Sequence, residues 1–267
     1  MKRLNLPTEK IIAEIKNNIG WLIFNQPEKR NAISLKMWEA IPVIIKEFSK
    51  NDEVRLVVMK GEGGKAFVSG ADISEFDEVR STPEQVHHYE KASSLAKNSL
   101  SNLKKPLIAM IDGFCIGGGM GIALTADIRI ASNDSKFGIP AARLGLGYGY
   151  EGIKELMNLV GPAYAKEIFF TGNRFSAIEA EKMGLINKTV EKQQLQEHVV
   201  QVADRIAMNA PLTVMASKAA INEGLKNFNE QNLDIIAQMV DNCFRSEDYI
   251  EGRRAFMEKR KPDFKGK

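Results

Sequence analysis

A cluster of glycines that follows a short apolar segment is the feature that most constrains the fold. Residues 113–124 read GFCIGGGMGIAL, and the apolar run LIAMI precedes them at residues 107–111. A continuous apolar run of this length is typical of a strand buried on both faces of a sheet. The apolar segment after the glycines has helical character, so the pattern predicts a strand, a turn and a helix. Repeated units of this kind define an α/β protein.

The same alternation of short apolar runs and amphipathic segments continues to about residue 190. We expect a hairpin turn at residues 17–20, a helix from the cap Ser34 to about residue 50, and a kink or boundary at Pro42. Beyond residue 193 the pattern is almost entirely helical, with Pro211 at a boundary. We therefore divide the chain into an α/β core, residues 1–195, and a helical region, residues 196–267. The expected strands cover residues 11–15, 21–24, 54–59, 67–68, 107–111, 128–131 and 186–190, and further helices cover 83–103, 151–160, 163–170 and 177–183.

Composition excludes several classes of protein. The chain has 267 residues, 44% of them hydrophobic, and a net charge of only +3 with both signs mixed, which argues against nucleic-acid binding. Cys115 and Cys243 lie far apart and indicate neither a disulfide framework nor a metal site. No apolar run suits a signal peptide or a membrane span, so we expect a cytoplasmic protein.

The glycine cluster does not fit the familiar glycine motifs. A dinucleotide-binding GxGxxG would need glycine where Ile122 or Leu124 stands, no GK[ST] follows, and no GxSxG surrounds Ser69. Two interpretations stay open: a tight strand–helix crossing, or free N–H groups that bind an anion or an oxygen that becomes anionic. A second Gly-Ala step, in AFVSGADI at residues 66–73, offers another such donor.

Seven motifs taken together resemble the enoyl-CoA hydratase/isomerase (crotonase) superfamily over nearly the whole chain. The resemblance implies a spiral of ββα units with a C-terminal helical trimerisation region, in a homotrimer or a dimer of trimers. It also implies an acyl-CoA thioester substrate, with no separate cofactor, no metal, no nucleic acid and no membrane partner. The motifs are NQPEKRNA (25–32), FVSGADI (67–73), KPLIAMIDG (105–113), IGGG (116–119), ADIRIA (126–131), AEKMGLI (180–186) and AFMEKR (255–260).

The resemblance assigns roles to individual residues. The backbone N–H groups of Ala71 and Gly118 match the family's oxyanion hole, which binds the thioester oxygen as it gains enolate charge. Asp72 could instead only brace a turn, and Lys259 could be an ordinary solvated lysine. The positions that match coenzyme A contacts are Lys29, Arg30, Ala71, Asp72 and Ile73, together with Phe256 and Lys259 for a neighbouring subunit.

The sequence departs from the family pattern at its acid–base groups. Gly121 and Ala141 stand where classical hydratases of the family carry two glutamates. Tyr148 matches a functional tyrosine of the methylmalonyl-CoA type of decarboxylase, and it could alternatively line an acyl pocket. Glu151 is the nearest carboxylate along the chain, and it could instead cap a helix. Hydration, decarboxylation, isomerisation and non-catalytic acyl-CoA binding therefore stay open. Arg143 could hold a substrate carboxylate or a structural acid.

Overall fold

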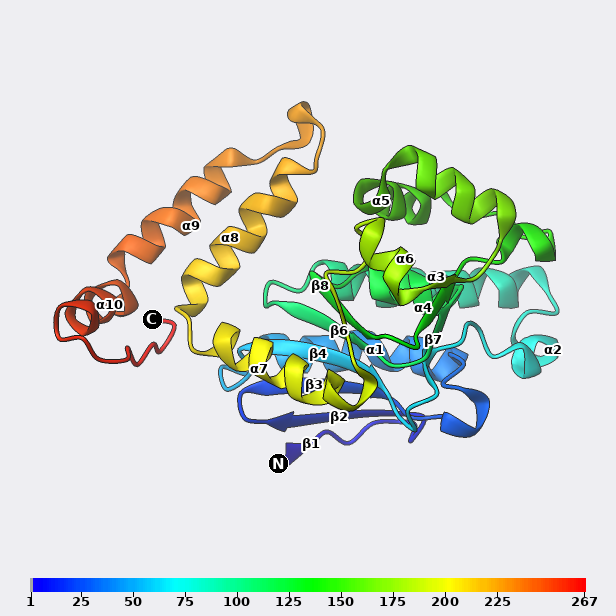
Figure 1. Cartoon of the computed structure of the whole chain (residues 1–267), viewed down its shortest axis with the longest axis horizontal. Coiled ribbons are helices and arrows are strands. Elements are labelled where there is room, and N and C mark those ends of the chain that lie inside the picture. The colour runs from blue at the N-terminus through cyan, green and yellow to red at the C-terminus, as the bar shows by residue number, and fades with distance from the viewer. Residues whose placement is uncertain (1) are drawn as a thin grey trace.

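Two sheets form the body of the molecule in the computed structural model, which describes residues 2–267 (Figure 1). The larger sheet has the strand order β1-β2-β3-β4-β6-β8-β11, and the smaller has the order β10-β9-β7-β5. From β3 to β11 the larger sheet is parallel, while β1 and β2 pair antiparallel. The strands of the larger sheet are β1 (Lys2–Arg3), β2 (Ile11–Lys16), β3 (Ile19–Phe24), β4 (Leu56–Gly61), β6 (Leu107–Ile111), β8 (Ile128–Ser132) and β11 (Lys188–Val190); those of the smaller are β5 (Ala66–Val68), β7 (Phe114–Ile116), β9 (Lys136–Gly138) and β10 (Phe175–Ser176).

The predicted hairpin joins β2 and β3. Asn17 and Asn18 both have positive φ, 52° and 62°, as a two-residue type I′ turn requires. Residues alternate between buried and partly exposed along β2, whereas β3 is buried throughout. The strand β2 therefore lies near the edge of the sheet, where only the two-residue β1 pairs with its outer side, and β3 lies in the interior.

Helices α1 (Leu35–Lys50) and α3 (Pro83–Ser101) cover one face of the larger sheet (Figure 1). The side chain of Ser34 caps α1 as expected, and Thr82 caps α3 through a capping box. The helix α1 continues through Pro42, so the boundary expected there is absent. Trp38 of α1 donates a hydrogen bond of 3.1 Å to the hydroxyl of Tyr89 in α3, which joins the two helices.

Short helices and turns connect the remaining strands. The helix α5 is broken at Gly161, whose φ of 73° and ψ of 168° precede Pro162, and this break separates the two helices expected over residues 151–170. The strands β7, β9 and β10 lie in segments without a predicted strand. The other elements are α2 (Phe76–Val79), α4 (Gly118–Leu124), α5 (Tyr150–Thr171), α6 (Ala177–Lys182) and the 3₁₀ turns at Pro27–Lys29, Ile73–Glu75, Ala141–Leu144, Lys192–Gln194 and Phe228–Glu230.

The core lies on both faces of the larger sheet. One face packs against α1, α3 and the smaller sheet, and the other packs against α7 (Leu195–Ala207). Leu195, Val199 and Ala203 of α7 are buried in one cluster with alternate residues of β3, β4 and β6. The predicted boundary after residue 195 stays a prediction, but α7 itself is part of this buried core.

Three helices stand away from the sheets and form what we call the C-terminal arm, residues 211–257 (Figure 1). They are α8 (Pro211–Gly224), α9 (Leu233–Arg245) and α10 (Glu247–Met257). No residue of α9 is buried in the chain as described from residue 2 onward. The arm instead exposes a series of large apolar side chains: Ile221, Leu225, Phe228, Leu233, Ile235, Val240, Phe244, Ile250, Phe256 and Met257.

Candidate active site

Two loops meet at one edge of the smaller sheet. The strands β5 and β7 are parallel neighbours, so the segments that follow them emerge on the same side. Ala71 follows β5 and Gly118 follows β7. A Cβ atom built on Gly118 would lie 3.8 Å from the backbone nitrogen of Ala71. The structure therefore brings together the two residues that the resemblance assigned to an oxyanion hole.

The N–H groups of these two residues are free. Within residues 2–267, neither nitrogen donates a hydrogen bond to the chain, whereas both neighbouring nitrogens do. Gly117 donates to the carbonyl oxygen of Gly138 at 2.9 Å, and Asp72 donates to that of Ile33 at 2.9 Å. Gly118 is the first residue of α4. The backbone N–H groups in this first turn have no intrahelical acceptor, and they form the positive end of the helix dipole.

The glycines at 117 and 119 have separate structural roles. Gly117 has a φ of 53° and a ψ of −111°, a conformation that side chains disfavour, and it turns the chain into α4. A Cβ atom on Gly119 would lie 2.0 Å from the carbonyl oxygen of Val68 in β5, so only glycine lets α4 approach that strand. Both interpretations of the cluster therefore apply: the strand–helix crossing is tight, and it leaves donors free.

A second group of side chains surrounds Gly121. A Cβ atom there would lie 3.8 Å from Cδ of Lys97 and 3.9 Å from the hydroxyl oxygen of Tyr148. Tyr148 precedes α5, and its ring packs edge to face on Phe169, with centroids 4.9 Å apart. Gly152 allows this position, because a Cβ atom on it would come within 2.8 Å of the tyrosine ring. The hydroxyl of Tyr148 thus faces Gly121.

Burial controls the protonation of this group. Desolvation, helped by the charge of Glu155, raises the pKa of Tyr148 to about 12. Desolvation also raises the pKa of Glu155, while Lys97 opposes that rise and Glu151 adds to it. Tyr148 is therefore a hydrogen-bond donor at neutral pH. Sequence analysis missed Lys97 and Glu155, although the i, i+4 spacing of Glu155 from Glu151 was a signal that both lie on one face of α5.

Other predicted site residues lie in different surroundings. Ala141 is buried and contributes no carboxylate, and Glu151 is exposed in the first turn of α5. Arg143 bonds the carbonyl oxygen of Thr171 and the side-chain oxygen of Asn173, so it fastens the end of α5. Within residues 2–267 no acidic side chain forms an ion pair with Arg143, so the expectation of a structural acid is wrong, while the substrate carboxylate stays a prediction.

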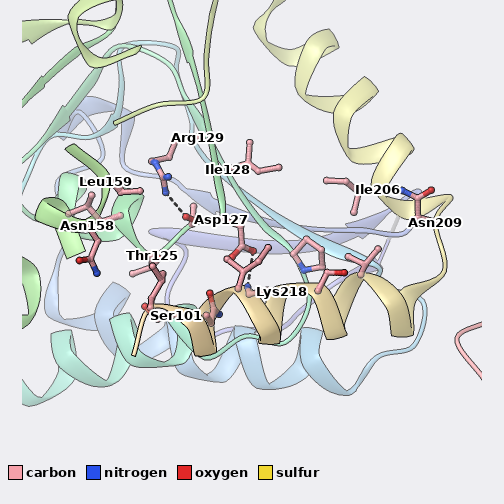
Figure 2. Close-up of a pocket in the computed structure, with 18 of the residues that line it drawn as sticks. Ser101, Thr125, Asp127, Ile128, Arg129, Asn158, Leu159, Ile206, Asn209 and Lys218 are labelled. Atoms are coloured by element: carbon pink, nitrogen blue, oxygen red, sulfur yellow. Dashed lines mark hydrogen bonds and ion pairs between the residues drawn. The ribbon is translucent and has the colours of Figure 1, made fainter. Parts of the chain in front are cut away.

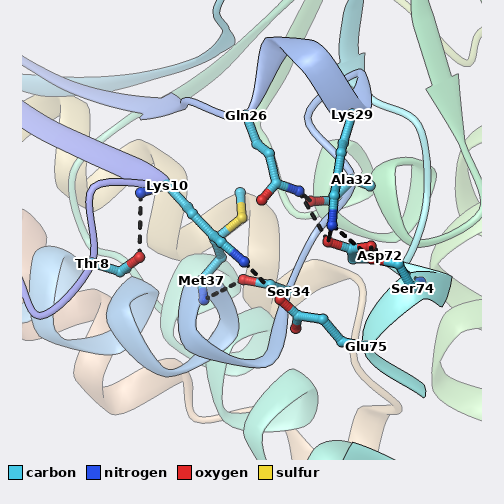
Figure 3. Close-up of polar contacts among 10 residues, drawn as sticks. All are labelled: Thr8, Lys10, Gln26, Lys29, Ala32, Ser34, Met37, Asp72, Ser74 and Glu75. Atoms are coloured by element: carbon cyan, nitrogen blue, oxygen red, sulfur yellow. Dashed lines mark hydrogen bonds and ion pairs between the residues drawn. The ribbon is translucent and has the colours of Figure 1, made fainter. Parts of the chain in front are cut away.

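Asp72 is the centre of a hydrogen-bonded network beside Ala71 (Figure 3). Its buried carboxylate accepts hydrogen bonds from Gln26 at 3.1 Å, from Lys29 at 3.0 Å and from the backbone and hydroxyl of Ser74. Desolvation opposes ionisation, but the hydrogen bonds from Ser74, Lys29 and Gln26 prevail and lower the pKa of Asp72. The Asp72 side chain therefore braces the turn, as one of its two interpretations proposed.

The remaining predicted coenzyme A contacts are spread over the chain. The Arg30 guanidinium lies over the Phe114 ring at 5.3 Å, and Ile73 is exposed next to the Asp72 network. Phe256 and Lys259 belong to α10 and the segment after it, on the far side of the molecule from α2 (Figure 1). Within one chain, the structure does not bring these last two residues to the Ala71 and Gly118 nitrogens.

A large cavity of about 950 Å³ lies elsewhere, between α8 and the body of the molecule (Figure 2). Asp127 and Lys218 form an ion pair of 2.7 Å in its wall. The buried Arg129 donates to the carbonyl oxygens of Leu185 and Ala126 and thereby closes the end of α4. Neither Ala71 nor Gly118 lines this cavity, so we do not assign the chemistry to it.

The fold and the paired loops define an α/β protein that presents two free amides at a sheet edge, and comparisons with known proteins agree with this class. The family model for enoyl-CoA hydratase/isomerase matches residues 14–267, and the chain belongs to that family. The predicted fold class is therefore confirmed. Residues 2–267 contain no helix with the length and apolar character that crossing a membrane requires.

Named relatives and solved structures match over almost the full length. The chain is 36% identical to short-chain-enoyl-CoA hydratase of Clostridium acetobutylicum, covering 94% of this chain and 95% of that protein. It is 34% identical to crotonyl-CoA hydratase of Syntrophomonas wolfei, with 96% and 98% covered. A crystal structure of an enoyl-CoA hydratase/isomerase family protein from Hyphomonas neptunium superposes with a TM-score of 0.90 at 36% identity, covering 96% and 97% of the two chains.

Proposed function

We propose that the protein is an enzyme that acts on acyl-CoA thioesters and stabilises a thioester enolate. One observation carries the proposal: the N–H groups of Ala71 and Gly118 lie close together and have no acceptor within residues 2–267. Two converging amides suit a single oxygen that gains negative charge during a reaction. The names of the relatives, which include enoyl-CoA and crotonyl-CoA hydratases, support a thioester as the source of that oxygen.

The positions of the amides and of Tyr148 suggest a separate role for each in the reaction. The thioester carbonyl oxygen would accept from both amides, and the electrons of the broken bond at the α-carbon would move onto that oxygen. Each N–H group of such a site is worth about 3 kcal/mol of transition-state stabilisation. Tyr148, protonated at neutral pH, stands over Gly121 and could donate a proton or a hydrogen bond at the far side of the acyl group.

Decarboxylation or isomerisation is the second candidate, because the positions of Gly121 and Ala141 carry no carboxylate. Gly121 and Ala141 leave the site without the two family glutamates, and Glu151 is exposed. Hydration needs a group that activates water, whereas loss of carbon dioxide supplies the enolate electrons itself. Tyr148 then suffices as a donor. A non-catalytic acyl-CoA binder is the outcome if neither reaction occurs.

We further propose that the site is completed by other copies of the chain, in a homotrimer or a dimer of trimers. The C-terminal arm exposes many large apolar side chains, a pattern typical of an interface. Phe256 is 82% exposed and lies far from its own Ala71, so it could reach only a neighbouring coenzyme A. Lys29, Arg30 and Ile73 would contact coenzyme A from the same chain. The proposal requires no cofactor beyond the coenzyme A of the substrate.

The decisive experiment is a screen of the purified protein against a panel of acyl-CoA thioesters, with products identified by mass spectrometry. Crotonyl-CoA tests hydration, and methylmalonyl-CoA tests decarboxylation. Turnover of any thioester that is lost in Gly118→Pro supports the proposed enolate chemistry. Binding without turnover across the panel would instead identify a binder, and no binding by folded protein would overturn the proposal.

A further inference from the structure

A lysine that none of the recognised motifs includes lies beside Gly121. Lys97 lies on α3, and its Cδ atom is 3.8 Å from the position of a Cβ atom on Gly121. The side chain is half-buried, and no carboxylate within residues 2–267 pairs with its ammonium group as an ion pair. A half-buried cation without an ion-paired carboxylate, beside the candidate site, suits the recognition of an anion.

The position of Lys97 relative to the amides limits where that anion lies. Gly121 follows Gly118 by three residues, so the two share one face of α4 and are separated by about 4.5 Å along the helix axis. An acyl group whose carbonyl oxygen is held at Gly118 would extend over Gly121 toward Lys97. A carboxylate three or four bonds beyond the carbonyl carbon would meet the ammonium group there.

The groups around Lys97 are compatible with a bound anion. The hydroxyl of Tyr148 lies 3.9 Å from the Cβ position of Gly121, and it is a donor at neutral pH. Glu155 and Glu151 are the acidic groups on the facing helix α5. Burial raises the pKa of Glu155 against the opposing charge of Lys97, Glu151 is exposed, and neither carboxylate forms an ion pair with Lys97 within residues 2–267.

We propose that Lys97 determines specificity by binding a carboxylate at the distal end of the acyl group, so that the substrate class is carboxylated acyl-CoA thioesters. This inference rests on the proposed function, because it assumes a thioester held at Ala71 and Gly118. Arg143, the arginine that sequence analysis considered for this role, is occupied at the end of α5.

The test compares thioesters that differ only in the terminal group. Succinyl-CoA is paired with butyryl-CoA, and glutaryl-CoA with valeryl-CoA, and dissociation constants are measured by isothermal titration calorimetry. We expect the unmodified protein to bind the carboxylated member of at least one pair about tenfold more tightly. Lys97→Met should abolish this preference and leave the affinity for the uncharged member unchanged.

Two further variants separate charge from packing. Lys97→Arg keeps the cation and should keep the preference. Lys91→Met removes an exposed lysine from the same helix and should behave as the unmodified protein. The inference is overturned by equal affinity within both pairs, by a preference that survives in Lys97→Met, or by a uniform loss of affinity for charged and uncharged thioesters alike. If none of the four thioesters binds the folded protein, the proposed function itself fails; if all bind equally, only the role of Lys97 fails.

Discussion

The two sides of the candidate site are built in opposite ways. On one side, Ala71 and Gly118 are fixed by backbone packing and by the hydrogen bonds of Asp72. On the other side, the loop that carries Tyr148 contains Gly145, Gly147 and Gly149, and Cβ atoms built on these glycines would meet nothing within 4 Å. Under the proposed function, this difference places a rigid site for a carbonyl oxygen next to an adaptable site for the rest of the acyl group.

The largest effect is expected when the rigid side loses a donor. Gly118→Pro removes the N–H group at the first position of α4, where proline fits the helix geometry. Without one of two donors, kcat/KM should fall about 100- to 1,000-fold on any thioester that the protein turns over. Steady-state kinetics measures the loss, and circular dichroism confirms that the variant is folded. Undiminished activity in a folded variant would contradict the oxyanion hole.

The adaptable side is tested by Tyr148→Phe. The ring can still pack on Phe169, but the donor facing Gly121 is lost. If Tyr148 supplies a proton, kcat should fall about 100-fold while the KM for the thioester changes little. Gly152→Ala is a matched perturbation, because its methyl group displaces the same ring without removing the hydroxyl. An unchanged kcat in Tyr148→Phe would exclude proton donation by Tyr148 and leave it only the role of lining the acyl pocket.

Asp72→Asn probes the brace of the rigid side. Hydrogen bonds hold the pKa of Asp72 below its ordinary value, so the stability that its charge contributes is present above the unfolded-state pKa and is lost as pH falls through the folded pKa. We expect the variant to lose about 2 kcal/mol in the free energy of unfolding at pH 7. The difference should shrink at pH 3, as urea titrations at both pH values would show. A difference that is the same at both pH values would argue against a charged brace.

The smallest effect is expected from stiffening the adaptable loop. Gly147→Ala meets no neighbouring atom, so alanine should fit and reduce the entropy of the unfolded chain. The free energy of unfolding should rise by about 0.5 kcal/mol, visible as a small increase in Tm. A decrease in Tm would mean that Gly147 serves a conformation unavailable to alanine.

The sequence predicted long elements well and short ones poorly. The buried run 107–111 coincides with β6, and the cap Ser34 gave the start of α1, because burial and capping are local signals. The strands β7, β9 and β10 were missed, since two or three residues are too few for a periodic pattern. The boundary expected at Pro42 was wrong, because α1 continues through it, while the kink stays a prediction.

The site was predicted unevenly for the same reason. The pairing of Ala71 with Gly118 came from the family resemblance, since nothing local relates two loops 47 residues apart, as their numbers show. Lys97 and Glu155 were missed because helices α3 and α5 are brought to Gly121 only by the fold. A structural acid was wrongly expected for Arg143, because its partners within the chain are uncharged oxygens at the end of α5.

The absence of a side chain at Gly119 bears on which parts of the site can change while the two amides stay in place. Because α4 rests directly on the Val68 carbonyl of β5, main-chain contact holds Gly118 at a fixed place beside the strand that leads to Ala71. Side chains on α3, α5 or the glycine-rich loop take no part in this contact. If the two amides bind a carbonyl oxygen as proposed, the chain can exchange one acyl group or reaction for another without rebuilding that half of the site.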